Sequence, residues 1–184
     1  YTAVSKIKYL LSGCILIGFI TFSLQLLAYN RFEHYTIENG LSQNTLSAIH
    51  QDRFGFIWFG TQSGLDRFDG YNFTSFVHQS DNPNSISGSF VLSLFEDKAG
   101  FIWVGTRSSG LNRFDPASQT FTRFIHDPGS ADSLSHNQVT SILQADNGEI
   151  WAGTYGGGIN ILNLENNTIR HLKHNENNLE SLGH

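Results

Sequence analysis

The feature that most restricts the fold of this chain is a segment that occurs three times. A polar turn is followed by an apolar run, a tryptophan, a small or apolar residue, and Gly-Thr. The tryptophans of the three copies are Trp58, Trp103 and Trp151, which recur with a period of about 45–50 residues. Self-similarity at this period indicates a repeat architecture, in which each repeat is one supersecondary unit.

Each copy has the same neighbours in the sequence. A glycine turn and a short strand follow it, and a serine–aliphatic pair precedes it: Ser85-Ile86, Ser133-Leu134 and Ser181-Leu182, with the order reversed in the first copy, as Leu41-Ser42. The last pair lies one full period after the pair before it, so a fourth copy is expected to begin there. We place the repeat units at about 40–84, 85–132 and 133–180.

Four short strands are expected in each unit. In the first unit they cover 45–50, 56–61, 65–69 and 71–77, and tight turns join them. The Asp69-Gly70 pair between the last two is a strong hairpin signal, because both residue types tolerate positive φ. The run 56–61 has no polar face, which favours a strand whose sheet is covered on both sides.

Four-stranded sheets of about 40–50 residues, each packed against two neighbours, are the blades of a β-propeller. A leucine-rich solenoid has a shorter period, and helical repeats need a 3.6-residue pattern that is absent. We therefore predict an all-β fold with three blades and the start of a fourth, in an incomplete ring. Gly60, Gly105 and Gly153 are expected to give room where blades crowd toward the central channel.

The segment Phe32-Glu33-His34 resembles the end of the fourth strand of each blade, for example Phe76-Val77-His78. It has no blade of its own within the sequence. We expect it to complete the sheet of the last blade, since closed propellers hide their edges in this way.

Residues 1–30 form a separate segment. Lys6 and Lys8 precede an uncharged stretch at 9–28, which as a hydrophobic helix is long enough to cross a membrane. The positive-inside rule then puts the residues after about 30 outside the cytoplasm. The stretch is longer than the core of a signal peptide, and Leu26-Leu27-Ala28 is a poor cleavage site, so both a signal peptide and a transmembrane anchor remain open.

Composition excludes several classes of protein. The formal net charge is −5, with 11 Lys and Arg against 16 Asp and Glu, and the cations form no cluster, so no nucleic-acid partner is expected. Cys14 is the one cysteine, which excludes a disulfide framework and a cysteine-rich zinc module.

The recurring polar residues are best explained by structure. Aspartates stand in the turn before each copy, at Asp52, Asp97 and Asp146, where an aspartate bonds its own backbone. Three histidines recur at a constant spacing, in the outer strands of separate blades, where they cannot converge on one metal: His78, His126 and His174. No nucleophile–base pair is found, so no catalytic, cofactor-binding or metal-binding residue and no cofactor is assigned.

Arginine and tryptophan recur inside strands, at Arg67 and Arg113 and at Trp58 and Trp103. These positions are expected to serve blade packing, with guanidinium stems covering aromatic rings. The residues at the glycine hairpins differ between copies, and function sits more often on variable loops carried by a rigid frame. The candidate ligand-facing residues are therefore Gln62, Ser63, Arg107, Ser108, Ser109 and Tyr155.

The pattern Gln-Asp-x-x-Gly-Phe-Ile-Trp-Phe-Gly-Thr-x-x-Gly-Leu-x-Arg-Phe-Asp-Gly at 51–70, led by Asn-Gly-Leu-Ser-Gln-Asn at 39–44, resembles the two-component regulator propeller family. The resemblance extends over 32–184. It implies an extracytoplasmic sensor domain of a bacterial membrane receptor. In this family the propeller follows a signal or membrane segment and precedes a membrane span and a cytoplasmic output. That output is most often a histidine kinase, frequently hybrid, and otherwise a diguanylate cyclase.

The resemblance thus implies a ligand-sensing domain on the periplasmic side of the bacterial cytoplasmic membrane. Its expected ligand is a small molecule or an oligosaccharide, and the full-length receptor is expected to form a homodimer. The sequence also allows two hypotheses from other functional classes: a periplasmic propeller enzyme, for instance one acting on polysaccharide, and an interaction scaffold.

Overall fold

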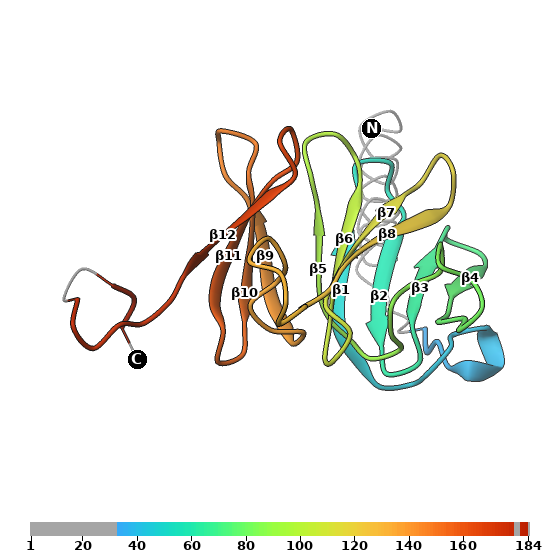
Figure 1. Cartoon of the computed structure of the whole chain (residues 1–184). Helices are drawn as coiled ribbons and strands as arrows, with labels where there is room; N and C mark the ends of the chain where they lie inside the picture. Colours follow the sequence, from blue (N-terminus) through green and yellow to red (C-terminus); the bar gives the residue numbers. More distant parts are fainter. Residues whose placement is uncertain (1–32, 179–180, 184) are drawn as a thin grey trace, which may run out of the picture. The chain divides into compact units, whose positions relative to one another are not determined.

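The computed structural model describes residues 33–178 and 181–183, and their regular structure is almost entirely β (Figure 1). A short 3-10 helix, η1 (Ile37–Asn39), precedes the strands. The first sheet consists of β1 (Leu46–Gln51), β2 (Ile57–Thr61), β3 (Leu65–Phe68) and β4 (Phe73–Phe76). The second consists of β5 (Val91–Glu96), β6 (Ile102–Thr106), β7 (Leu111–Asp115) and β8 (Thr120–Phe124). The third consists of β9 (Val139–Gln144), β10 (Ile150–Thr154), β11 (Gly158–Asn163) and β12 (Thr168–Leu172).

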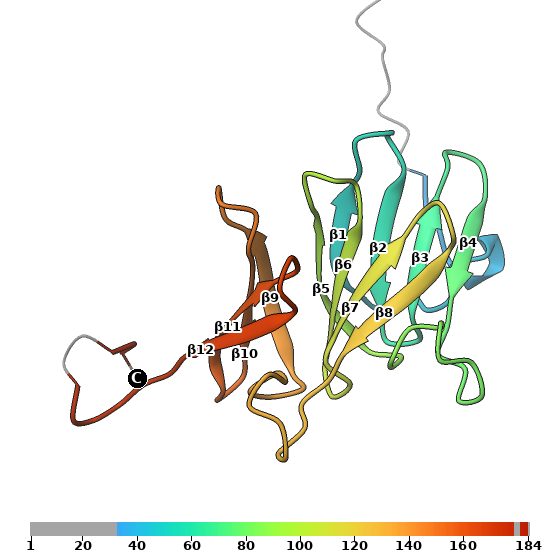
Figure 2. The same cartoon turned by 45° about the horizontal axis from the view of Figure 1, so that its top comes forward.

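Each sheet is an antiparallel meander whose spatial order follows the sequence. The first strands of successive sheets lie next to one another, β1 beside β5 and β5 beside β9, and the outer strands spread apart (Figures 1 and 2). This is the arrangement of propeller blades, so the predicted all-β blade architecture is confirmed. We refer to the three sheets as blades 1, 2 and 3.

Two parts of the sequence-based prediction fall on residues outside the described ranges. These are the hydrophobic helix within 1–30 and Phe32 of the segment expected to close the ring. Among residues 33–178 and 181–183, no helix has the length and apolar character needed to span a membrane. The proposed unit boundaries at 40–84, 85–132 and 133–180 also stay predictions.

The interval from Trp103 to Trp151 is longer than that from Trp58 to Trp103, and two surface loops account for the difference. The β2–β3 hairpin spans Thr61 to Gly64, whereas the β6–β7 hairpin spans Thr106 to Gly110 and is one residue longer. The β7–β8 turn is two residues longer than the β3–β4 turn. Insertions are tolerated at such exposed tips because no packed strand has to move.

Apolar packing joins each blade to the next. One cluster fills the space between blades 1 and 2 around Trp58, and a second fills the space between blades 2 and 3 around Trp103. Both tryptophans are at most 1% exposed. Trp58 stacks on Phe76 of its own blade and lies edge-on to Phe114 of blade 2. Burial therefore accumulates at the seams between blades, as expected when each repeat contacts mainly its neighbours.

The repeated glycines let the seams close. A Cβ placed on Gly60 would lie 2.6 Å from Cγ1 of Val91, on the first strand of blade 2. A Cβ on Gly105 would lie 2.3 Å from Oγ of Ser93 and 2.8 Å from the carbonyl oxygen of Val139 on blade 3. The prediction that these glycines give room between blades is confirmed at both seams.

Substitution of Gly105 by alanine is therefore expected to destabilise the protein. The added methyl group meets the backbone of the next blade, and overpacking of this kind costs about 1–3 kcal/mol. Thermal unfolding should show a midpoint lower by about 3–10 °C. Gly129→Ala is the matched control, because its Cβ would meet only Oδ1 of Asp127, at 3.3 Å. An unchanged midpoint for Gly105→Ala would contradict the close seam.

The serine–aliphatic pair is not reversed in the first blade. Leu41, Ile86 and Leu134 are equivalent buried residues, and a serine follows each of them. The backbone N–H of that serine donates to a fully buried side chain on the third strand: Ser42 to Asp66, Ser87 to Asn112 and Ser135 to Asn160, at 2.7–3.0 Å. Matching Leu41-Ser42 with Ser85-Ile86 by residue type places Ser42 opposite Ile86, whereas its structural equivalent is Ser87. The first copy is therefore aligned one residue out of register.

The three spaced histidines lie just beyond the fourth strands and not within them. In each case Nδ1 is bonded to a carbonyl oxygen eight residues later: His78 to Ile86, His126 to Leu134 and His174 to Leu182. The expectation that they occupy the outer strands is therefore wrong by a few residues. The imidazoles of His78 and His126 each hold the connection that leads into the next blade, and His174 holds the equivalent loop after β12.

The Asp69-Gly70 hairpin forms, but as a four-residue loop. Phe68 pairs directly with Phe73, and of the two predicted turn residues Gly70 alone has positive φ. The side chain of Asp69 instead accepts the N–H groups of Tyr71 and Asn72. The Asn72 and Tyr71 hydrogen bonds hold the pKa of the Asp69 carboxyl below its usual value.

Candidate functional site

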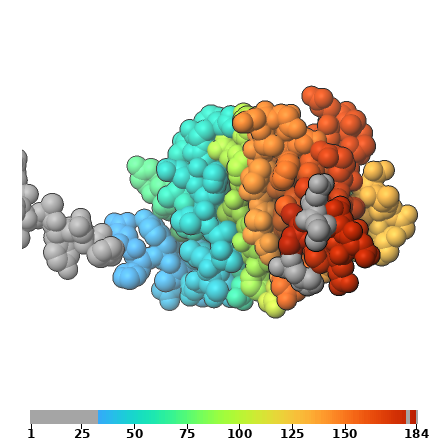
Figure 3. Space-filling view, turned by 90° about the vertical axis from the view of Figure 1, so that its left-hand side faces the viewer, coloured from blue at the N-terminus to red at the C-terminus, as the bar shows by residue number. Residues whose placement is uncertain are grey.

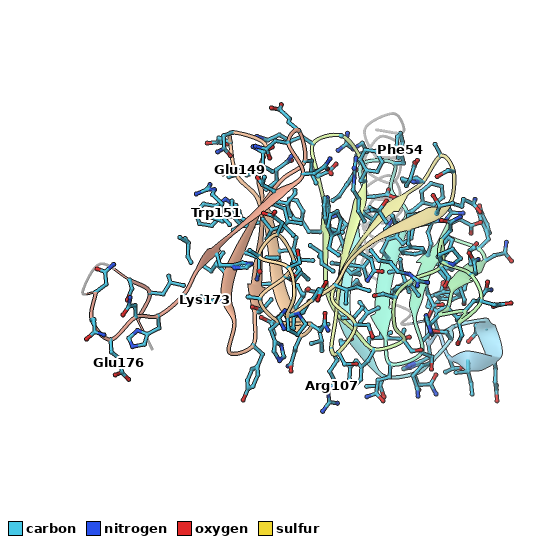
Figure 4. All side chains as sticks on the ribbon, in the orientation of Figure 1. Phe54, Arg107, Glu149, Trp151, Lys173 and Glu176 are labelled. Atoms are coloured by element: carbon cyan, nitrogen blue, oxygen red, sulfur yellow. The ribbon has the colours of Figure 1, made fainter. Side chains whose placement is uncertain are left out.

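The variable hairpins lie together at one end of the blades. The β2–β3, β6–β7 and β10–β11 hairpins carry all six candidate ligand-facing residues. The connections between blades, at 77–90 and 125–138, reach the same end, where Arg107 donates its N–H to Phe90 and Tyr155 donates to Gln138. In Figure 4, Arg107 lies at this end, and Phe54 and Glu149 lie at the opposite end. We call the hairpin end the tip surface.

Four of the candidate residues are exposed on the tip surface. Tyr155 is 68% exposed, and Gln62, Arg107 and Ser108 are exposed as well. The guanidinium carbon of Arg107 lies 5.1 Å from the centre of the Phe90 ring. A cation over an aromatic face is a stable arrangement that leaves the guanidinium N–H groups available to a ligand.

Ser63 and Ser109 belong to the frame of the hairpins. The N–H of Ser63 donates to Oγ1 of Thr61, and the N–H of Ser109 donates to Oγ1 of Thr106. The carbonyl oxygen of Ser109 also accepts the hydroxyl of Ser87 at 2.7 Å. Both serines are half-buried, so they set the shape of the tips that carry the exposed residues.

Sequence reasoning missed the partners that the connections add to this surface. Phe90 and Gln138 hold the tips of blades 2 and 3, and both lie outside the repeated pattern. A signal was available, since each is the residue immediately before the first strand of a blade and follows a segment with two or more serines. Without the pairing of strands, nothing in the sequence places these connections beside the hairpins.

The repeated aspartate holds the turn and also bonds the side chain of the buried tryptophan. Oδ1 of Asp52 accepts the N–H groups of Phe54 and Phe56, and Oδ2 accepts Nε1 of Trp58 at 2.8 Å. Asp97 makes the same set of bonds to its own turn, with 2.8 Å to Nε1 of Trp103. The prediction of a turn-forming aspartate is confirmed for these two residues, and the bond to the indole was not foreseen.

Asp146 is not the third member of this set. The residue six positions before Trp151 is Ala145, which makes the same backbone bonds of the turn as Asp52 and Asp97. Asp146 is exposed and its Oδ1 lies 3.6 Å from Nζ of Lys98. The alignment failed because an aspartate stands one residue further along in blade 3. Among the described residues, Nε1 of Trp151 is left buried and without a hydrogen bond of good geometry.

In blade 3 an ion pair takes the place of the arginine–phenylalanine contact found in blades 1 and 2. Arg113 on β7 lies 3.5 Å from the centre of the Phe101 ring, and Arg67 on β3 lies 4.9 Å from that of Phe56, as expected for packing. In blade 3 the ring is replaced by Glu149, and the arginine is on the fourth strand, at Arg170, 2.9 Å from Oε1 of Glu149. The Asn147 hydrogen bond and then Arg170 hold the pKa of Glu149 below its usual value.

A hollow lies at the end of the blades opposite the tip surface. Its volume is about 300 Å³, and it is lined by the turns of blades 1 and 2, including Phe54, Phe101 and Pro116. Phe54 is 75% exposed. These turns are the repeated ones that hold the frame, so this hollow is a weaker candidate than the tip surface.

The two component regulator propeller family model matches three segments of the chain, residues 40–63, 85–108 and 133–156. Each match runs from the residue before the buried aliphatic position to the hairpin of the blade. The matches align Gly40 with Ser85 and Ser133, in agreement with the structural register.

Two solved structures are similar to this chain over most of its length. The extracellular domain of a B. thetaiotaomicron protein described as a hybrid two-component system is 32% identical, with a TM-score of 0.73. The match covers 82% of this chain and 21% of that domain. Virginiamycin B lyase from Staphylococcus aureus matches at 17% identity and a TM-score of 0.53, over 70% of this chain and 41% of the lyase, which shows the fold alone.

One curated relative is histidine kinase P4 of Formosa agariphila, which is 38% identical over 74 residues. That match covers 40% of this chain and 5% of the kinase, so the chain spans a small part of the relatives it resembles. The three repeat matches, the blade geometry and the likeness to the extracellular domain of a hybrid two-component system support the same assignment. The three blades of this chain are repeats of the two-component regulator propeller family.

Proposed function

We propose that this propeller is the ligand-sensing periplasmic domain of a membrane receptor, most closely of the hybrid sensor histidine kinase type. The main observation that supports this proposal is the similarity to the extracellular domain of a protein described as a hybrid two-component system, over 82% of this chain. The partial match to a histidine kinase supports the same assignment. A diguanylate cyclase output is the alternative for a receptor of this kind.

The tip surface is the proposed ligand face. It combines exposed Gln62, Arg107 and Tyr155 on a frame that the buried Trp and Asx residues hold rigid. An aromatic ring, an amide and a guanidinium together suit a polar ligand with hydroxyl or carboxylate groups, such as an oligosaccharide or a small organic acid. Binding at the tips would draw blades 2 and 3 together, because Gly110 in the tip of blade 2 donates its N–H to Asn137, in the connection that also holds the tip of blade 3.

A binding screen on the intact protein tests this proposal. A panel of oligosaccharides and small organic acids is assayed for an increase in the unfolding temperature. For any compound that binds, the triple variant Gln62→Ala, Arg107→Ala, Tyr155→Ala should lose at least tenfold in affinity, about 1.4 kcal/mol. The matched control is Phe54→Ala, at the opposite end. Loss of binding in the control, with binding retained in the triple variant, would place the ligand elsewhere.

Membrane topology is a separate prediction. Lys6 and Lys8 are the cations before the apolar stretch at 9–28, so the residues after about 30 are expected outside the cytoplasmic membrane. An alkaline phosphatase fusion after Asn44 should be active. Activity of a β-galactosidase fusion at the same junction would show that the propeller stays in the cytoplasm.

A further inference from the structure

The connections into blades 2 and 3 fold in the same way. Oγ of Ser85 accepts the N–H of Gln79 and donates to the carbonyl oxygens of Gln79 and Asn82. Oγ of Ser133 makes the equivalent bonds to Asp127 and Ser130, each at 2.9 Å. The two connections therefore have the same loop conformation, each held by one serine hydroxyl. Equivalent oxygen atoms lie at equivalent positions in both.

In the first connection those oxygens bind an arginine. Nε of Arg123, on the fourth strand of blade 2, donates to the carbonyl oxygen of Ser85 at 2.9 Å. Its Nη2 donates to the carbonyl oxygen of Asn82 at 2.8 Å and to Oγ of Ser85 at 2.9 Å. One guanidinium therefore satisfies three acceptors and ties the connection to the blade it leads into.

In the second connection a histidine occupies the arginine position. His171 pairs across β11 and β12 with Asn160, as Arg123 pairs with Asn112. Its Nε2 reaches the carbonyl oxygen of Ser133 at 2.8 Å, which reproduces the Nε bond of the arginine. Imidazole is shorter than guanidinium, and His171 makes no bond to the carbonyl oxygen of Ser130 or to Oγ of Ser133. The two acceptors that hold Nη2 in the first connection lack that partner in the second.

A cavity of about 320 Å³ lies at this position, between the connection and the end of β12. Its lining includes His126, Asp127, Ser130, Ser133, His171 and Lys173. Carbonyl, hydroxyl and carboxylate oxygens favour a cation with N–H donors, and Lys173 opposes one. Lys173 is exposed, and no hydrogen bond of its ammonium group is found within the described part of the chain, so it does not occupy the acceptors.

We propose that this cavity binds a small molecule bearing a guanidinium group, which takes the position that the Arg123 side chain fills in the first connection. The bound group would tie the connection at 126–135 to blade 3. The site lies beside the outermost strand, and its lining does not include Gln62, Arg107 or Tyr155, so it does not rest on the proposed function. Because the group is small and partly solvated, we expect a Kd of about 1 mM.

Hydrogen–deuterium exchange of the intact protein tests the site, with ethylguanidinium chloride as the probe. Some amides at 126–135 exchange only when the connection opens locally and releases the ligand. At a probe concentration about ten times Kd, exchange of these amides should slow by about tenfold. The connection at 78–87 is an internal control, because Arg123 already fills it. Tetramethylammonium chloride at the same concentration has the charge without N–H donors, and it should have no effect.

Three variants sharpen the test. His171→Arg should slow exchange at 126–135 without ligand and abolish the response to ethylguanidinium. Arg123→His should transfer a ligand response to 78–87. Lys173→Gln should lower Kd by removing the like charge. The proposal is overturned if the wild type shows no slowing at 126–135 at a probe concentration about ten times the expected Kd, if 78–87 slows equally, or if His171→Arg still responds.

Discussion

When residues 31–184 are produced alone, the three blades are expected to self-associate or to unfold at a lower temperature than a closed propeller. In blade 2 both sheet faces contact a neighbour, whereas blades 1 and 3 each have one face without a neighbouring sheet among the described residues. Ile49, which pairs with Phe59 on the face opposite Trp58, is 67% exposed, and Leu143, which pairs with Trp151, is 50% exposed. Figure 3 views the molecule from the side of blade 3.

The expected loss is comparable to the stability of a domain. Burial of one large apolar side chain contributes roughly 1.5–3 kcal/mol, and a domain is stable by only about 5–15 kcal/mol. Mass in solution and thermal unfolding measure the outcome. Contacts within and between neighbouring blades can persist while the end blades fray. A monodisperse monomer with one cooperative transition would show that the end faces are covered in some other way.

Asp97→Ala is expected to destabilise the protein more than Gly105→Ala does. The change removes the acceptor of two backbone N–H groups and of Nε1 of Trp103, and the indole is fully buried. Leaving such donors unsatisfied costs about 1–3 kcal/mol each, so we expect a loss of about 3 kcal/mol or more. The unfolding midpoint should fall by about 6–12 °C.

Blade 3 supplies two matched controls for this prediction. Asp146→Ala removes an exposed aspartate whose Lys98 partner is also exposed, so the midpoint should change by less than about 1–2 °C. Ala145→Asp installs the missing acceptor six residues before Trp151 and should raise the midpoint. Equal effects of Asp97→Ala and Asp146→Ala would show that the indole bond contributes nothing.

The sequence predicted most of the frame because the frame is repeated. A position that is buried in one blade is buried in the next, so Trp58 and Trp103 or Gly60 and Gly105 report the same environment twice. Strand positions were right to within a few residues, since period, apolar runs and glycine turns all agree on them. The glycine role could be derived from sequence because a strand glycine at a fixed place in every repeat indicates close backbone approach.

The errors have a common physical cause. Asp146 and the Leu41-Ser42 pair were matched one residue out of register, because residue type alone does not distinguish a buried position from its exposed neighbour. Hydrogen bonds decide the register: Ala145 closes the turn of blade 3, and Ser42 donates to Asp66. A one-residue shift moves a strand residue to the other face, which only the pairing of strands reveals.

The blade could be predicted from the sequence: its four strands, its turns, its family and the variable tips that distinguish one copy from another. The contacts between atoms across the seams and at the ends of the blades became visible only in the packed structure. Arg107 lies over Phe90, Arg123 fills the first connection, and His171 leaves space in the second. Periodicity is a property of local backbone geometry, which sequence carries directly. Contacts between repeats depend on side-chain length and direction at positions far apart in the chain, and these are fixed only when the sheets pack.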